Sequence, residues 1–171
     1  MSAADPHARF EELVMPHLDA AYNLARWLAG NDHDAEDIAQ EACMRAFRFC
    51  GGFRGGNSRS WLLTIVRNTA YTWLKKNRSK NFISIADDEL EKIEDPAEPA
   101  AALHHADAGV LRTALEELPL EFREALVLRE LEGFSYKEIA DVADVPVGTV
   151  MSRLARARRH LQNHLNRKET K

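Results

Sequence analysis

The sequence predicts an all-α protein: two small helical domains joined by an acidic, flexible linker, with a helix-turn-helix in the C-terminal domain. Apolar residues recur every three or four positions through most of the chain, and no stretch alternates as a half-buried strand would. Between residues 82 and 107 this pattern gives way to one basic and eight acidic side chains. A chain of 171 residues is long enough for two small domains.

The first domain is expected to span residues 8–82 and to contain three helices. Apolar residues at helical spacing run from position 10 to position 28, and Gly30 then supplies a stop. The segment DAEDIAQEACMRAFRF carries a second apolar stripe, which ends at Phe49. Two glycine pairs bracket the loop that follows, and the third helix is expected from about residue 60 to about residue 76.

The linker is expected at residues 83–106 and the second domain at residues 107–167. Two prolines, abundant acidic residues and few large apolar ones are typical of a solvated tether. Helical spacing resumes in VLRTALEEL. Pro119 fits the first turn of the next helix, PLEFREALVLREL, and Gly133 closes that helix.

A helix-turn-helix is predicted near the C-terminus. Ser135 and Glu138 match the capping box that begins many helices, and residues 144–146 form a short turn with a proline at the entrance of the next helix. The apolar side of that second helix is expected to face inward and consists of Val147, Val150, Leu154, Ala157 and Leu161.

The other side of this second helix is rich in arginine and has groups suited to base edges in a DNA major groove. Arginine can bridge two acceptors of guanine, serine can donate or accept, and methionine or alanine can touch a thymine methyl group. The alternative is an ordinary helical hairpin with a solvated basic face. The candidate duplex-binding residues are Thr149, Met151, Ser152, Arg153, Ala155, Arg156 and Arg159.

The net charge of −4 conceals two basic blocks. Residues 51–81 carry seven basic and no acidic side chains, and residues 149–171 carry seven basic and one acidic. In the first block, basic residues alternate with aromatic and amide side chains, a composition that suits unstacked bases of single-stranded DNA. For Trp61 and Trp73 the alternative is a place in the core. The candidate single-strand residues are Asn57, Ser58, Arg59, Ser60, Asn68, Tyr71 and Lys75.

Several classes of protein are disfavoured by the sequence. It has no run of about 18 apolar residues, so no membrane insertion is expected, and the polar N-terminus lacks the apolar core of a signal peptide. The cytoplasm is therefore the expected compartment. Cys43 and Cys50, two helical turns apart, are interpreted as small, partly buried apolar side chains. Without a Walker loop, a nucleophile elbow or metal-ligand spacing, we expect no enzyme, cofactor or metal site.

The order of motifs resembles that of a known family. DAEDIAQEACMRAF, FRGGNSRSWLLTIVRNTA, an acidic linker and LPLEFREALVLRELEGFSYKEIADVADVPVGTVMSRLARARRHL follow one another along the chain. Over about residues 8–165 this arrangement resembles the extracytoplasmic-function (ECF) group of bacterial sigma factors. The resemblance implies that the chain binds core RNA polymerase, through the β′ clamp helices and the β flap, and directs it to promoter DNA.

The resemblance also implies a role for each candidate surface. The loop before the third helix and Asn68 match positions that capture flipped bases of the minus-ten element. The C-terminal helix matches the one that reads the minus-thirty-five element, and the acidic linker matches a segment that threads toward the RNA exit channel, although a simple tether is the alternative. An anti-sigma factor is an expected partner. The residues that match the core-binding segment are Asp34, Asp37, Gln40, Glu41 and Met44.

Two departures and one rival interpretation accompany the resemblance. Tyr71 stands where an acidic residue is common, and Lys75 and Lys76 stand where arginines are usual. Both departures keep a surface suited to nucleic acid, but the family's exact minus-ten preference does not carry over to this chain. The rival is a conventional helix-turn-helix regulator whose first domain senses a ligand or dimerises. Such a regulator binds an operator duplex alone, whereas a sigma factor needs core polymerase. A pure adaptor protein does not explain the two basic blocks.

Overall fold

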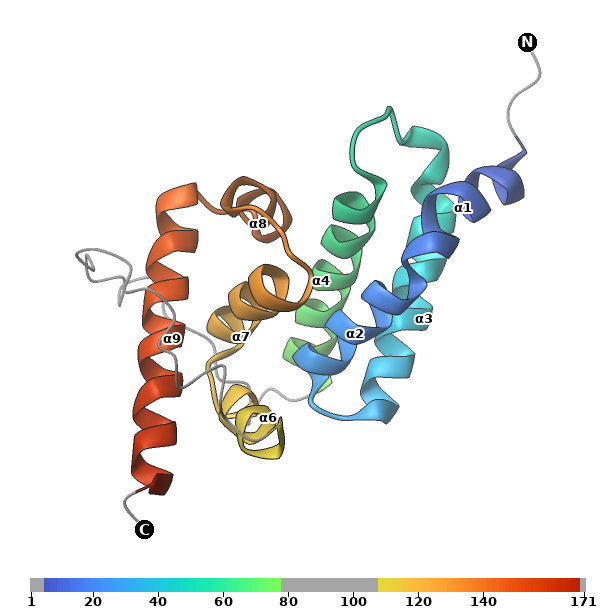
Figure 1. The fold of residues 1–171 in the computed structure, drawn as a ribbon. Helices are drawn as coiled ribbons and strands as arrows, with labels where there is room; N and C mark the ends of the chain where they lie inside the picture. The colour runs from blue at the N-terminus through green and yellow to red at the C-terminus, as the bar shows by residue number, and fades with distance from the viewer. Residues whose placement is uncertain (1–4, 78–107, 170–171) are drawn as a thin grey trace. The chain divides into compact units, whose positions relative to one another are not determined.

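The computed structural model describes residues 5–77 and 108–169, and over these residues it contains helices and turns but no strand (Figure 1). The prediction of an all-α fold is therefore confirmed. The chain divides into two compact units, the first built on helices before residue 78 and the second on helices after residue 107. The linker predicted at residues 83–106 lies outside the described residues.

The first unit is a small helical bundle in which α2, α3 and α4 pack against one another (Figure 1). Its buried side chains come from every helix and include Leu24, Ile38, Leu62 and Val66. The positive φ of Gly30, 85°, ends α2 as expected from the sequence. The elements of this unit are α1 (Pro6–Val14), the 3₁₀ turn η1 (Met15–His17), α2 (Leu18–Ala29), α3 (Asp32–Phe49), the 3₁₀ turn η2 (Cys50–Gly52) and α4 (Ser58–Asn77).

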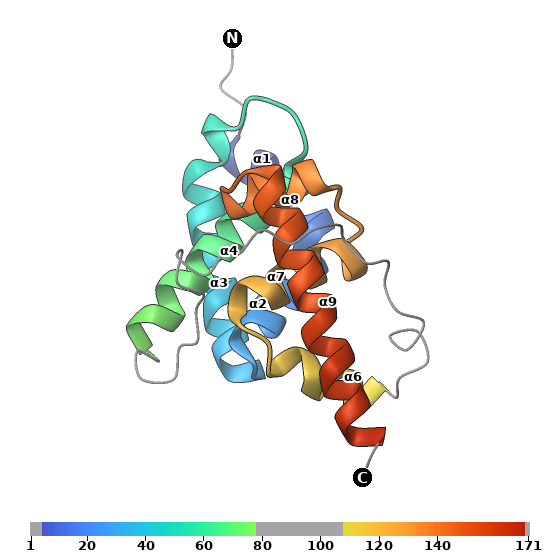
Figure 2. The same ribbon diagram turned by 90° about the vertical axis from the view of Figure 1, so that its left-hand side faces the viewer.

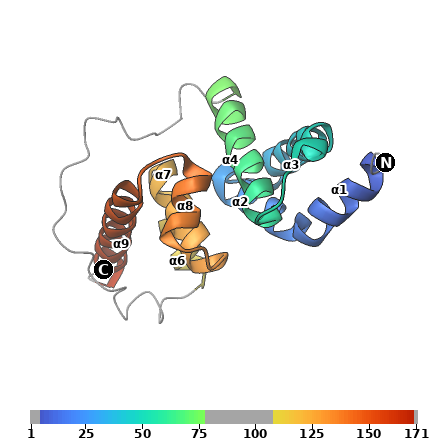
Figure 3. The ribbon, with the colours of Figure 1, turned by 90° about the horizontal axis from the view of Figure 1, so that it is seen from above.

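The first apolar stripe forms two helices rather than the single one expected. Pro16 has no backbone N–H, and its ring would clash with the carbonyl of the preceding turn inside an α-helix. The chain therefore ends α1 at Val14 and makes a 3₁₀ turn before α2 begins at Leu18. The break turns α1 away from the line of α2, so that α1 packs on α3, η2 and α4 (Figure 3). Phe49, expected on the inner stripe, lies exposed at the last residue of α3.

In the second unit two shorter helices pack along one long helix, α9. Figure 2 shows α9 running without interruption past α7 and α6, and both helices contact it. The buried side chains Phe134, Ile139 and Leu154 lie in this unit. Its elements are α6 (Ala108–Glu116), α7 (Leu120–Leu126), the π-helical turn η4 (Val127–Leu131), α8 (Tyr136–Ala143) and α9 (Val147–Glu169).

The π-helical turn η4 is a feature that the sequence pattern did not predict. Pro119 is the cap residue before α7 rather than part of its first turn, and regular helix ends at Leu126. In the wider turn that follows, the Glu132 amide donates to the Val127 carbonyl over 3.1 Å. The Phe134 amide then donates to the Leu128 carbonyl over 2.9 Å, across Gly133 with its φ of 68°. This closure buries the Phe134 ring and leaves Leu131 exposed.

The helix-turn-helix forms as predicted. The Glu138 amide donates to Ser135 Oγ over 3.1 Å, and the Ser135 amide donates to Glu138 Oε1 over 3.0 Å, which completes the capping box. Asp144 ends α8 with left-handed backbone angles (φ 55°, ψ 52°), and Pro146 leads into α9. Four of the five residues expected on the inner side of α9 are buried: Val150, Leu154, Ala157 and Leu161. Val147, the fifth, is exposed because it is the first residue of the helix.

Candidate nucleic-acid and polymerase interfaces

The N-terminal half of α9 presents several of the expected duplex-binding residues at its surface. Met151 and Arg159 are exposed, and Thr149, Ser152 and Arg156 are half-buried. The Ser152 hydroxyl donates to the Gly148 carbonyl over 3.1 Å, so its oxygen retains acceptor capacity for a base edge. One helix surface therefore combines a thioether, two hydroxyls and two guanidinium groups.

Two of the expected duplex-binding residues, Arg153 and Ala155, are turned inward. Arg153 is 9% exposed and Ala155 is 7% exposed. Arg158 is also buried, at 8%, and its Nη2 lies 3.2 Å from Glu130 Oε1. α9 packs against both α6 and α7, and its buried stripe is wider than the narrow apolar face visible in the sequence. Arg153 and Ala155 are therefore left out of the duplex-reading surface.

The loop before α4 is held at its end by a helix cap. Asn57 Oδ1 accepts a hydrogen bond from the Ser60 amide over 3.2 Å, which satisfies one of the orphan amides of the first turn. Asn57 is exposed, and Ser58, Arg59 and Ser60 are half-buried. All four polar residues therefore lie at the N-terminal end of α4, where backbone amides and the helix dipole favour an anionic ligand.

Further along α4, an amide and an aromatic ring gather beside a guanidinium group. Arg67 Nη1 donates to Asn68 Oδ1 over 3.3 Å, and the Arg67 guanidinium lies 3.8 Å from the centre of the Tyr71 ring. The cation–π contact orients both groups on one side of the helix. Asn68 and Lys75 are exposed, and Tyr71 is half-buried. The structure thus brings together Arg67, Asn68 and Tyr71.

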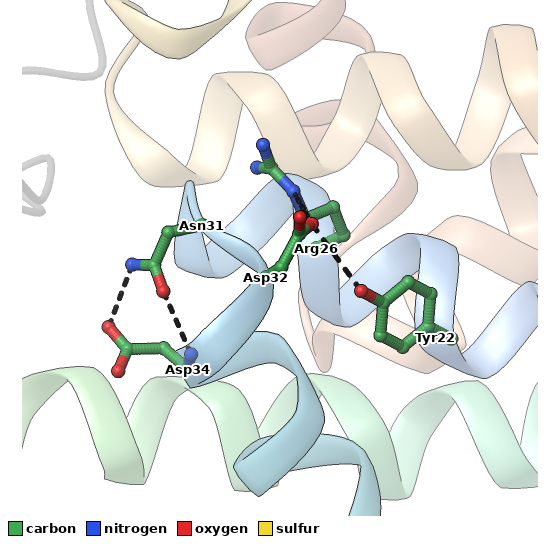
Figure 4. Close-up of polar contacts among 5 residues, drawn as sticks. All are labelled: Tyr22, Arg26, Asn31, Asp32 and Asp34. Carbon is green, nitrogen blue, oxygen red and sulfur yellow. Dashed lines mark hydrogen bonds and ion pairs between the residues drawn. The ribbon is translucent and has the colours of Figure 1, made fainter.

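The start of α3 is fixed by a set of short polar contacts (Figure 4). Asn31 Oδ1 accepts from the Asp34 amide over 2.8 Å, and Asn31 Nδ2 donates to Asp34 Oδ2 over 2.9 Å. Arg26 Nε lies 2.7 Å from Asp32 Oδ1, an atom that also accepts from the Tyr22 hydroxyl over 3.4 Å. Desolvation and the nearby Asp32 carboxylate raise the pKa of Tyr22, because both disfavour the phenolate. Asp34 is thus part of the cap that sets where α3 begins.

The rest of the expected core-binding residues follow along α3. Asp37 and Glu41 are half-buried and carry nearby basic groups, with His33 Nε2 at 3.8 Å from Asp37 and Arg45 Nε at 3.1 Å from Glu41. Gln40 is exposed, and Met44 is 60% exposed. The carboxylates, the amide and the thioether lie on the polar side of α3, opposite its buried Ile38 and Ala42.

Neither a metal cluster nor a membrane span was found in the described ranges. Within residues 5–77 and 108–169, no three His, Cys, Asp or Glu side chains are grouped as metal ligands would be. In the same residues no helix has both the length and the apolar character needed to cross a bilayer.

Comparison with known proteins places both units in one family. Residues 13–80 match the family model of sigma-70 region 2, and residues 108–161 match that of sigma-70 region 4. The RNA polymerase sigma-H factor of Pseudomonas aeruginosa is 36% identical over 167 residues, which cover 91% of this chain and 86% of that protein. The ECF RNA polymerase sigma-E factor of Escherichia coli K12 is 36% identical over 140 residues, which cover 76% of this chain and 73% of that protein. This chain belongs to the ECF family of RNA polymerase sigma factors. It is thus a factor of transcription initiation.

Other relatives of this sigma factor extend the comparison. The ECF RNA polymerase sigma factor SigE of Mycolicibacterium smegmatis is 38% identical over 158 residues, which are 91% of this chain but 61% of that relative's length. Among solved structures, the sigma factor RpoE from Bartonella quintana, in complex with the anti-sigma factor NepR, superposes with a TM-score of 0.71 at 32% identity. That match covers 92% of this chain and 96% of the other. CnrH, in complex with the cytosolic domain of CnrY, shares the fold with a TM-score of 0.64 at 23% identity.

An apolar groove that the sequence did not reveal lies beside the residues expected to bind core polymerase. The Phe47 ring packs on His7 and Phe10 of α1, with ring centres 5.2 Å and 5.6 Å apart. Together with Cys43, Met44 and Arg48 these residues line an open groove of about 650 Å³. Burial raises the pKa of the Cys43 thiol. Phe47 stood within the quoted motif, but its partners lie on α1, which the sequence did not place beside α3.

Proposed function

We propose that this sigma factor binds core RNA polymerase, directs it to a specific set of promoters and promotes strand opening there. The observation that carries the proposal is a capped helix-turn-helix whose second helix, α9, presents Met151, Ser152, Arg156 and Arg159 outward. The chain acts by recognition rather than by catalysis, as a factor that works in the bacterial cytoplasm, where transcription takes place. Residues 8–82 would bind core polymerase and the minus-ten element, and residues 107–167 would bind the minus-thirty-five element.

Core polymerase would bind the polar side of α3. Asp37 and Glu41 offer carboxylates to a basic partner surface, and Met44 adds an exposed thioether between them and the apolar groove. Such a mixture of a polar rim and a small apolar centre is usual in protein interfaces. We assign this face to the β′ clamp helices, and we assign contact with the β flap to the second unit.

The minus-thirty-five element would be read as a duplex by α9. Arg156 is the candidate for a bidentate contact with guanine, while Met151 and Ser152 are candidates for neighbouring base edges. The exposed guanidinium of Arg159 would neutralise phosphate. These four residues share the outward surface of one helix, as insertion in a major groove requires.

The minus-ten element would be captured as single-stranded DNA by the start of α4. Asn57, Ser58, Arg59 and Ser60 supply hydrogen-bonding groups, and Asn68 lies beside the stacked Arg67 and Tyr71 further along the same helix. Lys75 would attract the backbone. Binding an extruded base there would offset the few kcal/mol needed to unstack it from the duplex.

An anti-sigma factor is the proposed regulator. The related sigma factor from Bartonella quintana was solved in complex with the anti-sigma factor NepR, and it covers nearly the whole of this chain at 32% identity. We propose that a protein of this kind competes with core polymerase for this sigma factor.

Transcription by purified components tests the proposal. The chain, bacterial core polymerase and a random promoter library are combined, and the transcripts are sequenced. The proposal requires specific initiation only when both proteins are present. Specific binding of the isolated chain to the same duplexes, with no effect of the chain on initiation, would identify a conventional helix-turn-helix regulator instead.

Charge reversal on α3 tests the proposed core-binding face separately. The double variant Asp37→Lys and Glu41→Lys is expected to weaken core binding while its helical circular dichroism stays unchanged. Reversal of Glu12, an exposed carboxylate on α1, is the matched control. Unchanged assembly of the double variant with core polymerase would remove this face from the proposal.

A further inference from the structure

The loop between η2 and α4 has little to hold it in its own sequence. Gly55 and Gly56 both have positive φ angles, 96° and 98°, and no atom lies within 4 Å of where a Cβ would stand on either. Glycine has the largest backbone freedom to lose on ordering. Residues 53–57 therefore need anchors at their ends if the polar groups that follow are to keep one position.

One anchor lies at the first residue of the loop. Arg9 Nη2 on α1 donates to the Phe53 carbonyl over 3.0 Å, and its guanidinium lies 5.7 Å from the centre of the Phe53 ring. The Phe53 ring packs on Trp61 of α4, with ring centres 5.3 Å apart. Arg9 thus holds both the backbone and the ring where the loop begins, and it does so from a helix 44 residues away in the sequence.

The second anchor lies at the end of the loop. The Nε2 atom of His17, the last residue of η1, is 3.2 Å from Ser58 Oγ, and Ser58 is the first residue of α4. The bond forms in either tautomer, since the hydroxyl can donate or accept. The chain breaks its helix at Pro16, α1 packs on η2 and α4, and His17 follows directly after the break.

We propose that Arg9 and His17 are positioning residues for the minus-ten site: they hold both ends of the loop at residues 53–57 in the conformation that captures single-stranded DNA. This inference rests on the proposed function. The entropic cost of ordering the glycine-rich loop then falls on folding, and it does not reduce the free energy of DNA binding. The α1 segment would act on base preference without touching a base.

The test measures base preference by the holoenzyme. Wild-type holoenzyme first selects a preferred minus-ten oligonucleotide from a random single-stranded library, and a second oligonucleotide differs from it at one selected base. The affinities of Arg9→Ala and His17→Leu holoenzymes for both are then measured. Arg26→Ala is the matched control. The Arg26 side chain is 26% exposed, close to the 31% of Arg9, and it lies in the same unit. Arg26 pairs with Asp32 instead of holding the loop.

Arg9→Ala is expected to weaken binding of the preferred oligonucleotide about tenfold, the loss typical of one charge-assisted hydrogen bond. Binding of the altered oligonucleotide should change by less than about twofold, since nonspecific phosphate contacts remain. His17→Leu should act in the same direction, and His17→Gln, which keeps a polar atom near the position of Nε2, should restore preference. Arg26→Ala should keep the wild-type preference.

Three outcomes decide against this inference or against the function beneath it. Wild-type preference retained in both Arg9→Ala and His17→Leu overturns the positioning role. Equal losses on both oligonucleotides, together with weaker core binding and a lower unfolding temperature, would mean that Arg9 and His17 only stabilise the first unit, which also overturns it. Absence of any preference in the wild-type holoenzyme would instead refute the proposed minus-ten function.

Discussion

On α4, a guanidinium group lies at the surface beside an aromatic ring and an amide, whereas on α9 the arginines are divided between the outside and the inside of the helix. On α4, Arg67 stacks on Tyr71 and bonds Asn68 at the surface. On α9, Arg159 is exposed, but Arg153 and Arg158 are buried, and Arg158 is paired with Glu130. A dense run of arginines therefore does not measure the positive charge available to DNA. On α9, part of that run holds the helix in place.

The largest effect that separates the two kinds of arginine is expected at Arg158. Arg158→Ala should lower the free energy of unfolding of the second unit by up to about 3 kcal/mol, the low end for breaking a buried pair, because Glu130 remains half exposed. All three tryptophans lie in the first unit, so tryptophan fluorescence would not report the unfolding of the second. The measurement is therefore hydrogen exchange of the backbone amides in α7 and α9. Arg159→Ala is the control and should change stability by less than about 0.5 kcal/mol. Equal protection of the backbone amides from exchange in Arg158→Ala and Arg159→Ala would contradict a structural role for Arg158.

Arg156 tests whether the outer arginines read sequence. Arg156→Ala should cost about 1–3 kcal/mol of binding to the preferred minus-thirty-five duplex and relax preference at one base pair, if its contact with guanine is bidentate. Holoenzyme binding to a set of single-base-pair variants of the promoter would measure this. A uniform loss across the whole set would make Arg156 a phosphate contact.

Asn68 tests the surface of the first unit in the same way. Asn68→Ala should reduce open complexes roughly tenfold, a loss equal to one hydrogen bond to an extruded base, and should affect closed binding much less. Permanganate footprinting of promoter thymines measures the melted fraction. Ser58→Ala should give a milder form of the same defect. Normal melting with an unaltered minus-ten preference in Asn68→Ala would remove that residue from the site.

The smallest effect is expected from the exposed Arg159. Arg159→Ala should weaken holoenzyme binding by a similar factor on every minus-thirty-five sequence and should reduce the slope of log affinity against log salt by about one. Titrations at several salt concentrations with preferred and altered duplexes would show this. A loss of affinity confined to one base pair would instead mean that Arg159 reads sequence, as is expected of Arg156.

Signals local to a few residues predicted the fold well. The capping box at Ser135 and Glu138, the stop at Gly30 and the inner stripe of α9 all depend on neighbours within one or two helical turns, and the structure has each of them. For the same reason the sequence alone placed the helix-turn-helix. The residues assigned to polymerase and DNA contact stay predictions.

What the sequence did not reveal depends on contacts between distant elements. Arg153 is buried on α9, a helix that packs against α6 and α7, and the groove at Phe47 follows from α1 packing on α3. A π-helical turn such as η4 holds one residue more than an α-helical turn, so it displaces the apolar residues that follow by a single position. A displacement that small does not show in a pattern that already varies between three and four residues. Pro16 was readable as a helix breaker, but an apolar stripe that continued across it outweighed that signal.

The half-buried thiol of Cys43 gives the groove a chemical reporter. Cys43 lines the groove, whereas Cys50 is buried, so a maleimide should label the first and leave the second largely unmodified. Only the thiolate reacts, and because burial raises the pKa of Cys43, labelling should be slow at neutral pH and accelerate as the solution becomes more alkaline. At a fixed pH, the rate of alkylation then follows the occupancy of this face. A ligand that covers α3 should protect Cys43 in proportion to the fraction of chains it has bound.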